Sequence, residues 1–383
     1  MKFINSLFSL TLLSTILSSE SPVKISTSAI DGDYLVGLRG DARSSIDAHI
    51  NTVKGLMKER SGNNKIETVF NNLGNLYHAK FNNDLLQKVR ALPDVEFIEN
   101  NKQITVKTVQ ENADWGIARI SQRNFTKKTT YTYDGEGEGV AVYVIDTGVF
   151  VNHPEFEGRA RSGPFYAGNN TEDEYGHGTH CAGIIASKTY GVAKKAQIIS
   201  IKMIDGSGKG DIASLIKGMD WAVGDKAGVK GNVVSLSLGG DKDTALNAAV
   251  EATYQKGFVV VAAAGNENED ACTRSPGSAP NAITVGASDK KDEYAYFSNY
   301  GKCVDIIAPG VDILAPWKDG SVQKKSGTSM ACPNVAGLAA YYLSKENLTN
   351  AQVTQKIISS ASKGFVKYAG KTTPNLLAYN SIA

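Results

Sequence analysis

Runs of apolar residues in the second part of the chain constrain its fold more than any other feature. Five of them, largely uninterrupted by polar residues, occupy positions 140–145, 198–201, 233–238, 258–262 and 282–285. Such runs are typical of strands buried on both faces of a parallel sheet. Helical patterns lie between them, at 212–223 and 244–256. This alternation predicts an α/β fold, a doubly wound and mostly parallel sheet with helices on both sides in three layers.

A smaller region with a different pattern precedes these runs, from about residue 31 to residue 107. It reads as a strand at 33–39, a helix at 44–59, two strands within 65–81, a helix at 83–92 and a strand at 95–106. The order βαββαβ is that of a small α+β domain of the ferredoxin-like type. This fold is shared by many unrelated proteins, so it predicts no function by itself.

The N-terminus has the features of a secretory signal peptide. Lys2 is followed by an apolar stretch at 7–17 and then by Ser18 and Ser19. The stretch is shorter than the roughly 20 residues that a membrane span needs, and small residues follow it as at a cleavage site. No later segment of the sequence is apolar enough to span a bilayer, so we expect a secreted protein without a membrane anchor. Secretion would permit disulfides and would make three sequons available for glycosylation, at Asn124, Asn169 and Asn347.

The charge balance excludes two classes of protein. Lys and Arg number 41 and Asp and Glu number 39, which leaves a formal net charge of +2. A globally basic nucleic-acid-binding protein and a protein with a strongly acidic tail are therefore not expected. The 42% of apolar residues argue against a disordered chain, and four cysteines are too few for a disulfide scaffold.

Three polar residues that follow apolar runs or open helical patterns are of the types that nucleophilic catalysis uses. Asp146 ends the run at 140–145, His177 lies between glycines at a predicted helix start, and Ser329 precedes a predicted helix. A nucleophilic serine needs a base within hydrogen-bonding distance and an acid that orients the base. Taken singly, each has a simpler interpretation: an Asp or Ser before a helix is commonly a cap, and a His beside glycines is commonly structural.

Together, the segments around these residues resemble the subtilisin family of serine proteases, whose chain order is Asp, His, Ser. The resemblance is greatest to the proteinase K branch and covers almost the whole chain after Thr108, including 115–120 and 375–380. The leading region is similar to the inhibitory propeptide of that family. The resemblance therefore implies a signal peptide at 1–20, an inhibitory and chaperone propeptide at 21–107, and a subtilisin-like peptidase domain at 108–383.

The resemblance also implies a role for each site residue. Ser329 would be the nucleophile, His177 the general base, Asp146 the residue that orients the base, and Asn266 a side-chain donor to the oxyanion. Arg274 is expected near the floor of the pocket for the P1 side chain, and the P1 preference is left open. The walls of that pocket are expected to be formed by Ser237, Leu238, Gly239, Ala263, Ala264 and Gly265. Gly208 and Gly210 are expected in the edge segment that pairs with extended substrate. Pairing through the main chain binds many sequences, so broad specificity is expected.

A calcium ion and one disulfide are further expectations from the resemblance. The ligands would be the carbonyl oxygens of Pro280 and Ala282 and the carboxylate of Asp305, a set that suits Ca²⁺. Cys272 and Cys303 align with a disulfide seen in some members of the branch. Zinc on His177, His180 and Cys181 is disfavoured, because the triad already uses the first of these and no further ligand motif is present.

The function expected from the sequence is that of a secreted serine endopeptidase of broad specificity, acting on polypeptides as a monomer. An active protease endangers its own secretory pathway, so we expect a zymogen that its propeptide inhibits and that cuts itself near Lys107–Thr108. The main alternative is a catalytically silent binding protein on the same fold, against which the four intact catalytic positions argue. A processing protease of the kexin type fits less well because no acidic cluster in the sequence marks a dibasic pocket. A serine esterase fits less well because Gly327-Thr328-Ser329-Met330-Ala331 departs from the esterase pattern.

Overall fold

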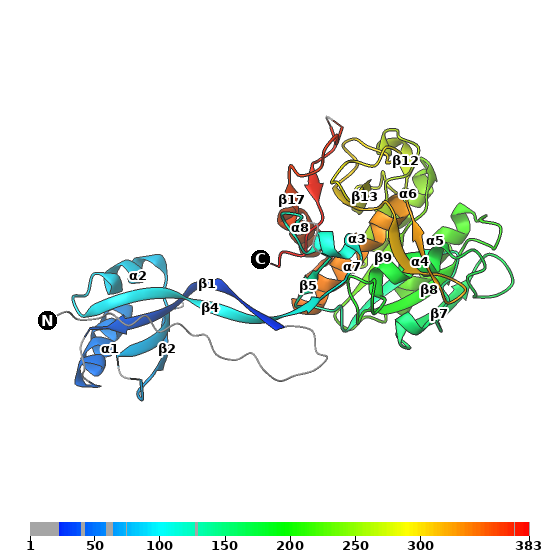
Figure 1. Ribbon diagram of the computed structural model, residues 1–383. Helices are drawn as coiled ribbons and strands as arrows, with labels where there is room; N and C mark the ends of the chain where they lie inside the picture. The colour runs from blue at the N-terminus through cyan, green and yellow to red at the C-terminus, as the bar shows by residue number, and fades with distance from the viewer. Residues whose placement is uncertain are drawn as a thin grey trace. The chain divides into compact units, whose positions relative to one another are not determined.

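The computed structural model describes residues 23–39, 43–58, 64–73, 75–126, 129–370 and 372–382. The predicted signal peptide, 1–20, lies outside the described residues. The described chain divides into two compact units, one formed by Val23–Lys107 and the other by the chain from Thr108 onwards (Figure 1). No helix within the described ranges is both long and apolar enough to cross a membrane.

The first unit contains four strands of one sheet and two helices. Its strands lie in the order β2-β3-β1-β4, and β1 pairs with β3 in an antiparallel register. The elements follow the chain as β1 (Val23–Leu38), α1 (Arg43–Lys58), β2 (Lys65–Val69), β3 (Leu76–Lys80), α2 (Asn83–Arg90) and β4 (Val95–Gln110). This confirms the predicted βαββαβ order. Strand β1 begins well before the predicted residue 33, because Gly32, with φ of 71°, lies inside the strand and does not end it.

The second unit is built on a nine-stranded sheet in the order β17-β18-β14-β13-β11-β9-β6-β8-β7. All of its neighbouring strands run parallel except the edge pair β17 and β18. The strands are β6 (Val140–Asp146), β7 (Ala160–Phe165), β8 (Gln197–Lys202), β9 (Gly231–Leu236), β11 (Val259–Ala263), β13 (Ala282–Ser288), β14 (Ile306–Pro309), β17 (Ser362–Lys363) and β18 (Leu376–Leu377). The five apolar runs are thus confirmed as strands of one sheet.

Helices cover both faces of this sheet. Along β6, Val142 packs in one core with α4, α7 and α8, whereas Tyr143 packs in a second core with α5 and α6. Every residue of β6 is buried, which explains why the run is apolar throughout. The helices are α3 (Trp115–Ile120), α4 (His177–Ala186), α5 (Ile212–Asp225), α6 (Thr244–Gln255), α7 (Thr328–Lys345) and α8 (Asn350–Ser360), with 3-10 turns η1 (Pro154–Phe156) and η2 (Ala271–Thr273).

Three short antiparallel pairs complete the second unit. The end of β4, from Thr108, pairs with β5 (Tyr131–Tyr133). The other pairs are β10 (Gly240–Asp241) with β12 (Arg274–Ser275), and β15 (Ile313–Pro316) with β16 (Val322–Lys325). Strands β6, β9 and β11 are neighbours in the large sheet, so the segments that follow them emerge at one edge, where α/β folds commonly bind ligands.

Candidate active site

Asp146 and His177 form a hydrogen-bonded pair at that edge. His177 Nδ1 lies 2.7 Å from Asp146 Oδ1, and the Asp146 carboxylate is fully buried at the end of β6. An ionised carboxylate can only accept, so Nδ1 carries the proton and Nε2 is left as the proton acceptor. Burial of the ring favours the neutral imidazole, but the charge of Asp146 outweighs it and raises the pKa of His177 well above its ordinary value.

The glycines around His177 allow α4 to begin against the turn that follows Asp146. A Cβ atom at Gly178 would lie 2.1 Å from the carbonyl oxygen of Gly148, closer than real Cβ contacts. The two segments can approach only because position 178 has no side chain. This approach brings the His177 ring within reach of Asp146.

Ser329 is the second residue of α7, where backbone N–H groups have no acceptor within the helix. Its hydroxyl donates to the carbonyl oxygen of Ser237 at 2.9 Å, and among the described residues no hydrogen bond joins Ser329 to His177. The starts of α4 and α7 lie side by side and share a contact with Cys181. Its Sγ lies 3.8 Å from His177 Nδ1 and 3.4 Å from the Ser329 carbonyl oxygen. That oxygen lacks its usual intrahelical donor because Pro333, four residues on, has no N–H.

Asn266 is oriented by Thr328. Its Oδ1 accepts from the Thr328 backbone N–H at 2.8 Å and from the Thr328 hydroxyl at 3.0 Å. A backbone N–H can only donate, so the amide oxygen of Asn266 must face Thr328 and the NH₂ group must point away from it. The side chain therefore presents a fixed donor in the pocket that Ser329 also lines.

A pocket of about 250 Å³ opens beside Ser329. Eight predicted site residues line it: Ser237, Leu238, Gly239, Ala263, Ala264, Gly265, Asn266 and Ser329. Arg274, expected at the floor, lines it too, and so do four residues that the sequence did not single out, namely Gly240, Glu267, Ser275 and Thr328. Segments after β9 and β11, the start of α7 and strand β12 thus share one concave surface.

Gly208 and Gly210 do not line this pocket. They lie in the loop between β8 and α5, where Gly208 has a φ of 82°. A Cβ atom at Gly210 would meet the carbonyl oxygen of Met203 at 2.3 Å, so the loop folds back too closely for any other residue. Their predicted pairing with substrate stays a prediction.

Two buried polar residues that the sequence analysis missed hold these segments in place. Asp173, before α4, accepts from Thr147 Oγ1 at 2.7 Å and from the backbone N–H of Gly176 at 2.7 Å. It thereby joins the turn after Asp146 to the start of the helix that carries His177. Asn299, fully buried, donates to the Ala264 carbonyl oxygen at 3.0 Å and to Glu267 at 2.8 Å, and so supports the Asn266 loop. Neither Asp173 nor Asn299 lies in a recognisable motif, so the sequence gives no sign of their role, which depends on their burial in the fold.

The free thiols lie beneath the site. Cys181 and Cys332 are both buried, and burial raises the pKa of both, that of Cys332 to about 12. Asp146, His177 and Cys181 have potential metal-ligating atoms within 4.8 Å of one another. His180 is not part of this group, and its Nε2 lies 2.9 Å from the Gln323 carbonyl oxygen. The structure therefore does not bring together the three residues considered for zinc.

The residues expected to hold calcium offer suitable oxygens. Asp305 Oδ2 accepts from the backbone N–H of Thr284 at 2.8 Å, and burial raises the pKa of the Asp305 carboxyl to about 6. No cationic side chain within the described ranges pairs with it. A partly buried carboxylate without a cation, near the chain segment of Pro280 and Ala282, fits a hard divalent ion.

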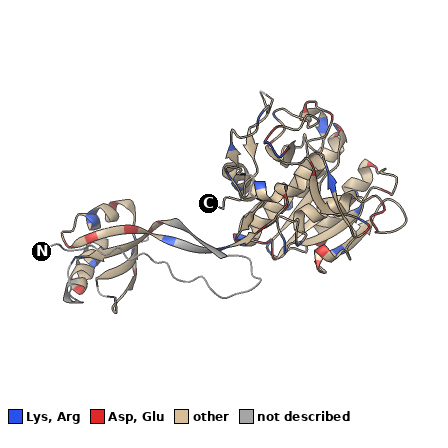
Figure 2. Ribbon diagram, viewed as in Figure 1, with Lys and Arg blue, Asp and Glu red and all other residues tan. Residues whose placement is uncertain are grey.

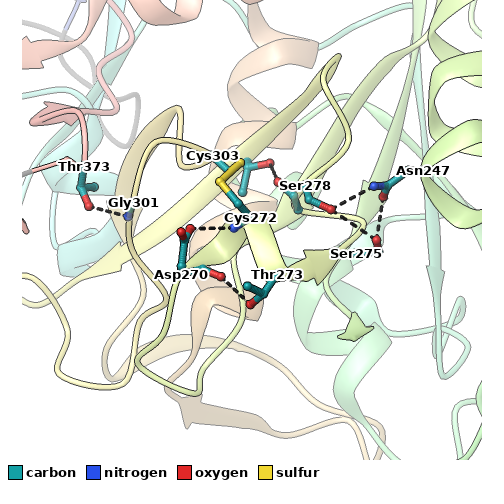
Figure 3. The surroundings of a disulfide bond; sticks show 11 residues. Asn247, Asp270, Cys272, Thr273, Ser275, Ser278, Gly301, Cys303 and Thr373 are labelled. Atoms are coloured by element: carbon teal, nitrogen blue, oxygen red, sulfur yellow. Dashed lines mark hydrogen bonds between the residues drawn. A yellow bond between two sulfur atoms is a disulfide. The ribbon is translucent and has the colours of Figure 1, made fainter. Parts of the chain in front are cut away.

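The expected disulfide is present, and the sequons are exposed. Cys272 and Cys303 are joined, with Cα atoms 5.3 Å apart (Figure 3). The crosslink closes a loop of 31 residues, which is worth roughly 3–4 kcal/mol in the chain-entropy description of disulfides. Asn124, Asn169 and Asn347 all lie on the surface outside helices and strands.

Known proteins resemble this chain over most of its length. Residues 137–377 match the subtilase family. The cuticle-degrading serine protease of Arthrobotrys oligospora is 42% identical over 93% of this chain and 92% of its own, and proteinase R of Parengyodontium album is 42% identical over 91% and 88%. The crystal structure of a cold-adapted subtilisin-like serine proteinase is 43% identical, with a TM-score of 0.69 over 71% of this chain and 100% of its own.

Proposed function

Because this chain belongs to the subtilase family of serine proteases, we propose that it is a secreted endopeptidase of broad specificity that matures by cutting its own precursor. One observation carries the proposal: Ser329 and Asn266 line one pocket, and Cys181 contacts both Ser329 and the His177 ring that Asp146 holds. These residues come from distant parts of the chain, so capping roles alone do not account for their meeting.

In the proposed mechanism the Ser329 hydroxyl turns from the Ser237 carbonyl oxygen towards His177 Nε2. The imidazole takes the hydroxyl proton as Ser329 Oγ attacks the scissile carbonyl carbon, and it later gives the proton to the leaving amine. Asp146 keeps the reactive tautomer and stabilises the imidazolium that forms.

The oxyanion of the tetrahedral intermediate would be held by the Asn266 amide and the Ser329 backbone N–H. The position of Ser329 at the start of α7 adds the favourable field of the helix N-terminus. Donors fixed before the reaction stabilise the developing charge without any rearrangement.

Replacement of Asn266 by alanine is expected to lower kcat by about 10²–10³-fold with little change in KM. The amide meets the substrate oxygen at full strength only after that oxygen becomes anionic. Steady-state hydrolysis of a peptide anilide checks this. Asn266→Asp separates loss of the NH₂ donor from loss of the contact with Thr328. It keeps an oxygen that can accept from the Thr328 N–H but has no NH₂ group. Full activity in either variant would contradict the assignment.

We propose that residues 1–20 are a signal peptide, that 21–107 are a propeptide, and that 108–383 are the peptidase. The division of the structure into a unit ending at Lys107 and another beginning at Thr108 supports a junction there. The ferredoxin-like order of the first unit suits an inhibitory and chaperone propeptide. Secretion would expose Asn124, Asn169 and Asn347 to glycosylation, and their surface positions are compatible with it.

The substrates would be polypeptides in extended form, bound along the segment of Gly208 and Gly210 and with a P1 side chain in the pocket. Acidic and basic residues are interspersed over the ribbon (Figure 2), which does not favour nucleic acid as a partner. We propose that the mature enzyme acts as a monomer.

Calcium would be held by the carbonyl oxygens of Pro280 and Ala282 and by Asp305, and its chemistry would be structural. Removal of calcium is therefore expected to lower the thermal midpoint of unfolding. Free ion at a hundredfold excess over Kd contributes about 2.7 kcal/mol, which corresponds to roughly 5–10 °C for a domain of this size. Calorimetry of the Ser329→Ala protein, which cannot digest itself, with and without chelator measures the shift. Asp305→Asn should abolish it, and an unchanged shift in that variant would place the ion elsewhere.

The proposal as a whole is tested on the purified wild-type precursor. Mass spectrometry should show release of a fragment ending near Lys107, and casein hydrolysis should begin as that fragment is degraded. If the precursor stays whole and casein stays uncut, even after an added protease removes the leading unit, the chain is instead a binding protein on a subtilase fold.

A further inference from the structure

A cluster of four charged side chains lies at one wall of the pocket beside Ser329, and two of the four line the pocket itself. Arg274 and Glu267 line the pocket, and Asp241 and Glu269 lie next to Arg274. Arg274 Nη1 lies 2.8 Å from Asp241 Oδ1, Arg274 Nε lies 3.9 Å from Glu267 Oε2, and Arg274 Nε also donates to Glu269 Oε1. Three carboxylates thus face one guanidinium, and the cluster has a net charge of −2.

Arg274 is held in place through its backbone on both sides. It pairs with Asp241 in the short ladder of β12 and β10, so the two oppositely charged side chains are cross-strand neighbours. Two residues earlier, Cys272 is fixed by the disulfide and by Asp270, which accepts from the Cys272 backbone N–H at 2.9 Å (Figure 3). One residue later, Ser275 donates to Asn247 at 2.8 Å. The guanidinium is therefore positioned before any substrate arrives.

Glu267 is equally well placed. Its Oε2 accepts from the Asn266 backbone N–H at 2.9 Å and from the buried Asn299 amide at 2.8 Å. These bonds hold the carboxylate on the pocket wall, next to the proposed oxyanion donor. Hydrogen bonding to Arg274 lowers the pKa of Glu269, and hydrogen bonding to Glu269 raises the pKa of Arg274, so the contact between these two groups favours the charged form of each.

We infer that this cluster makes the pocket discriminate P1 side chains by charge, favouring Lys or Arg over Asp or Glu, with Arg274 as the residue that limits the preference. The inference rests on the proposed peptidase function and names its substrate class. An acidic P1 group would meet a guanidinium whose Nε and Nη1 already donate to carboxylates, and it would be repelled by three negative charges. A basic P1 group would gain from the net field and could approach Glu267. The expected self-cleavage site, with Lys107 at P1, agrees with this direction.

The test uses peptide anilides that differ only at P1, with Lys, Met or Glu in that position, on enzyme whose active sites are counted with a serine-directed phosphonate. We expect kcat/KM for Lys to exceed that for Glu at least about tenfold at low salt, with the ratio narrowing in 0.5 M NaCl as the charges are screened. Arg274→Met should raise the Lys:Glu ratio several-fold because it removes the only positive charge of the cluster. Asp241→Asn, at a side chain that is 97% exposed, should lower the ratio about two- to threefold without risk to folding.

Arg161→Met is the matched control, because it removes an arginine charge that pairs with Asp225 and that does not line the pocket. Its Lys:Glu ratio should equal that of the wild type. A preference for Glu over Lys, or a ratio that neither Arg274→Met nor Asp241→Asn changes, would overturn the inference while leaving the peptidase function intact. Failure of the phosphonate to label Ser329, together with no cleavage of any anilide, would instead overturn both.

Discussion

Replacement of Ser329 by alanine is expected to leave the precursor uncut and to lower kcat by about 10⁶-fold, the loss that subtilisin shows without its nucleophile. The reason is that the acyl bond forms on the Ser329 oxygen, which alanine lacks, and that the nearby thiols of Cys181 and Cys332 are buried, which raises the pKa of both. Residual hydrolysis above the rate in water would come from the oxyanion donors and from substrate binding. Mass spectrometry of the precursor over time and hydrolysis of casein measure the two effects.

Two controls distinguish self-cleavage of the precursor from cleavage by a contaminating protease. The Ser329→Ala precursor should be cut when a trace of mature wild-type enzyme is added, because its junction is unchanged. Ser359→Ala makes a matched control, since Ser359 is exposed on α8 and does not line the pocket beside Ser329. A Ser329→Ala precursor that matures alone at the wild-type rate would show that another residue is the nucleophile.

Replacement of Asp146 by asparagine is expected to lower kcat by about 10⁴-fold at neutral pH, the loss seen for the corresponding change in a protease with the same triad. An amide in this position can donate to His177 Nδ1, which would place the ring proton on Nε2 and remove the proton acceptor. The change is isosteric, so the buried site should keep its shape. Steady-state kinetics on a peptide anilide and an unfolding curve of the same sample measure the effect and check the fold.

The pH dependence of kcat/KM should shift in Asp146→Asn, because the variant loses the negative charge beside His177. Catalysis needs a neutral imidazole, and Asp146 raises the pKa of His177 above 6.5, so wild-type kcat/KM should rise with pH through a midpoint above 6.5. Asparagine carries no charge, and burial alone lowers the pKa of the ring, so the midpoint of Asp146→Asn should move to lower pH. A midpoint that stays in place or rises in the variant would contradict the proposed pairing.

The strands of the large sheet could be predicted because each carries its information locally. A strand buried on both faces must be apolar at every position, as β6 is, and the runs at 140–145 and 258–262 show this without any knowledge of their neighbours. Strand β1 was less predictable. Gly32 breaks its pattern, and only the finished sheet shows that the strand continues through it.

The candidate catalytic residues could be found because each lies in a short motif that follows an apolar run or opens a helix. Residues such as Asp173 and Asn299 could not, because an isolated Asp or Asn in a loop looks the same whether it is buried or exposed. Their importance depends on which distant backbone N–H groups surround them, for example those of Gly176 for Asp173 and of Glu267 for Asn299.

The sequence by itself determined the layered α/β fold, the small leading domain and the chemical types at the site, because periodicity and motifs act over short stretches of chain. The tertiary structure alone decided the direction of the Ser329 hydroxyl, the anchoring of the Asn266 amide and the charge cluster around Arg274. Each of these depends on groups that are far apart in the chain, such as Asp241 and Arg274, and that meet only after strands β10 and β12 have paired.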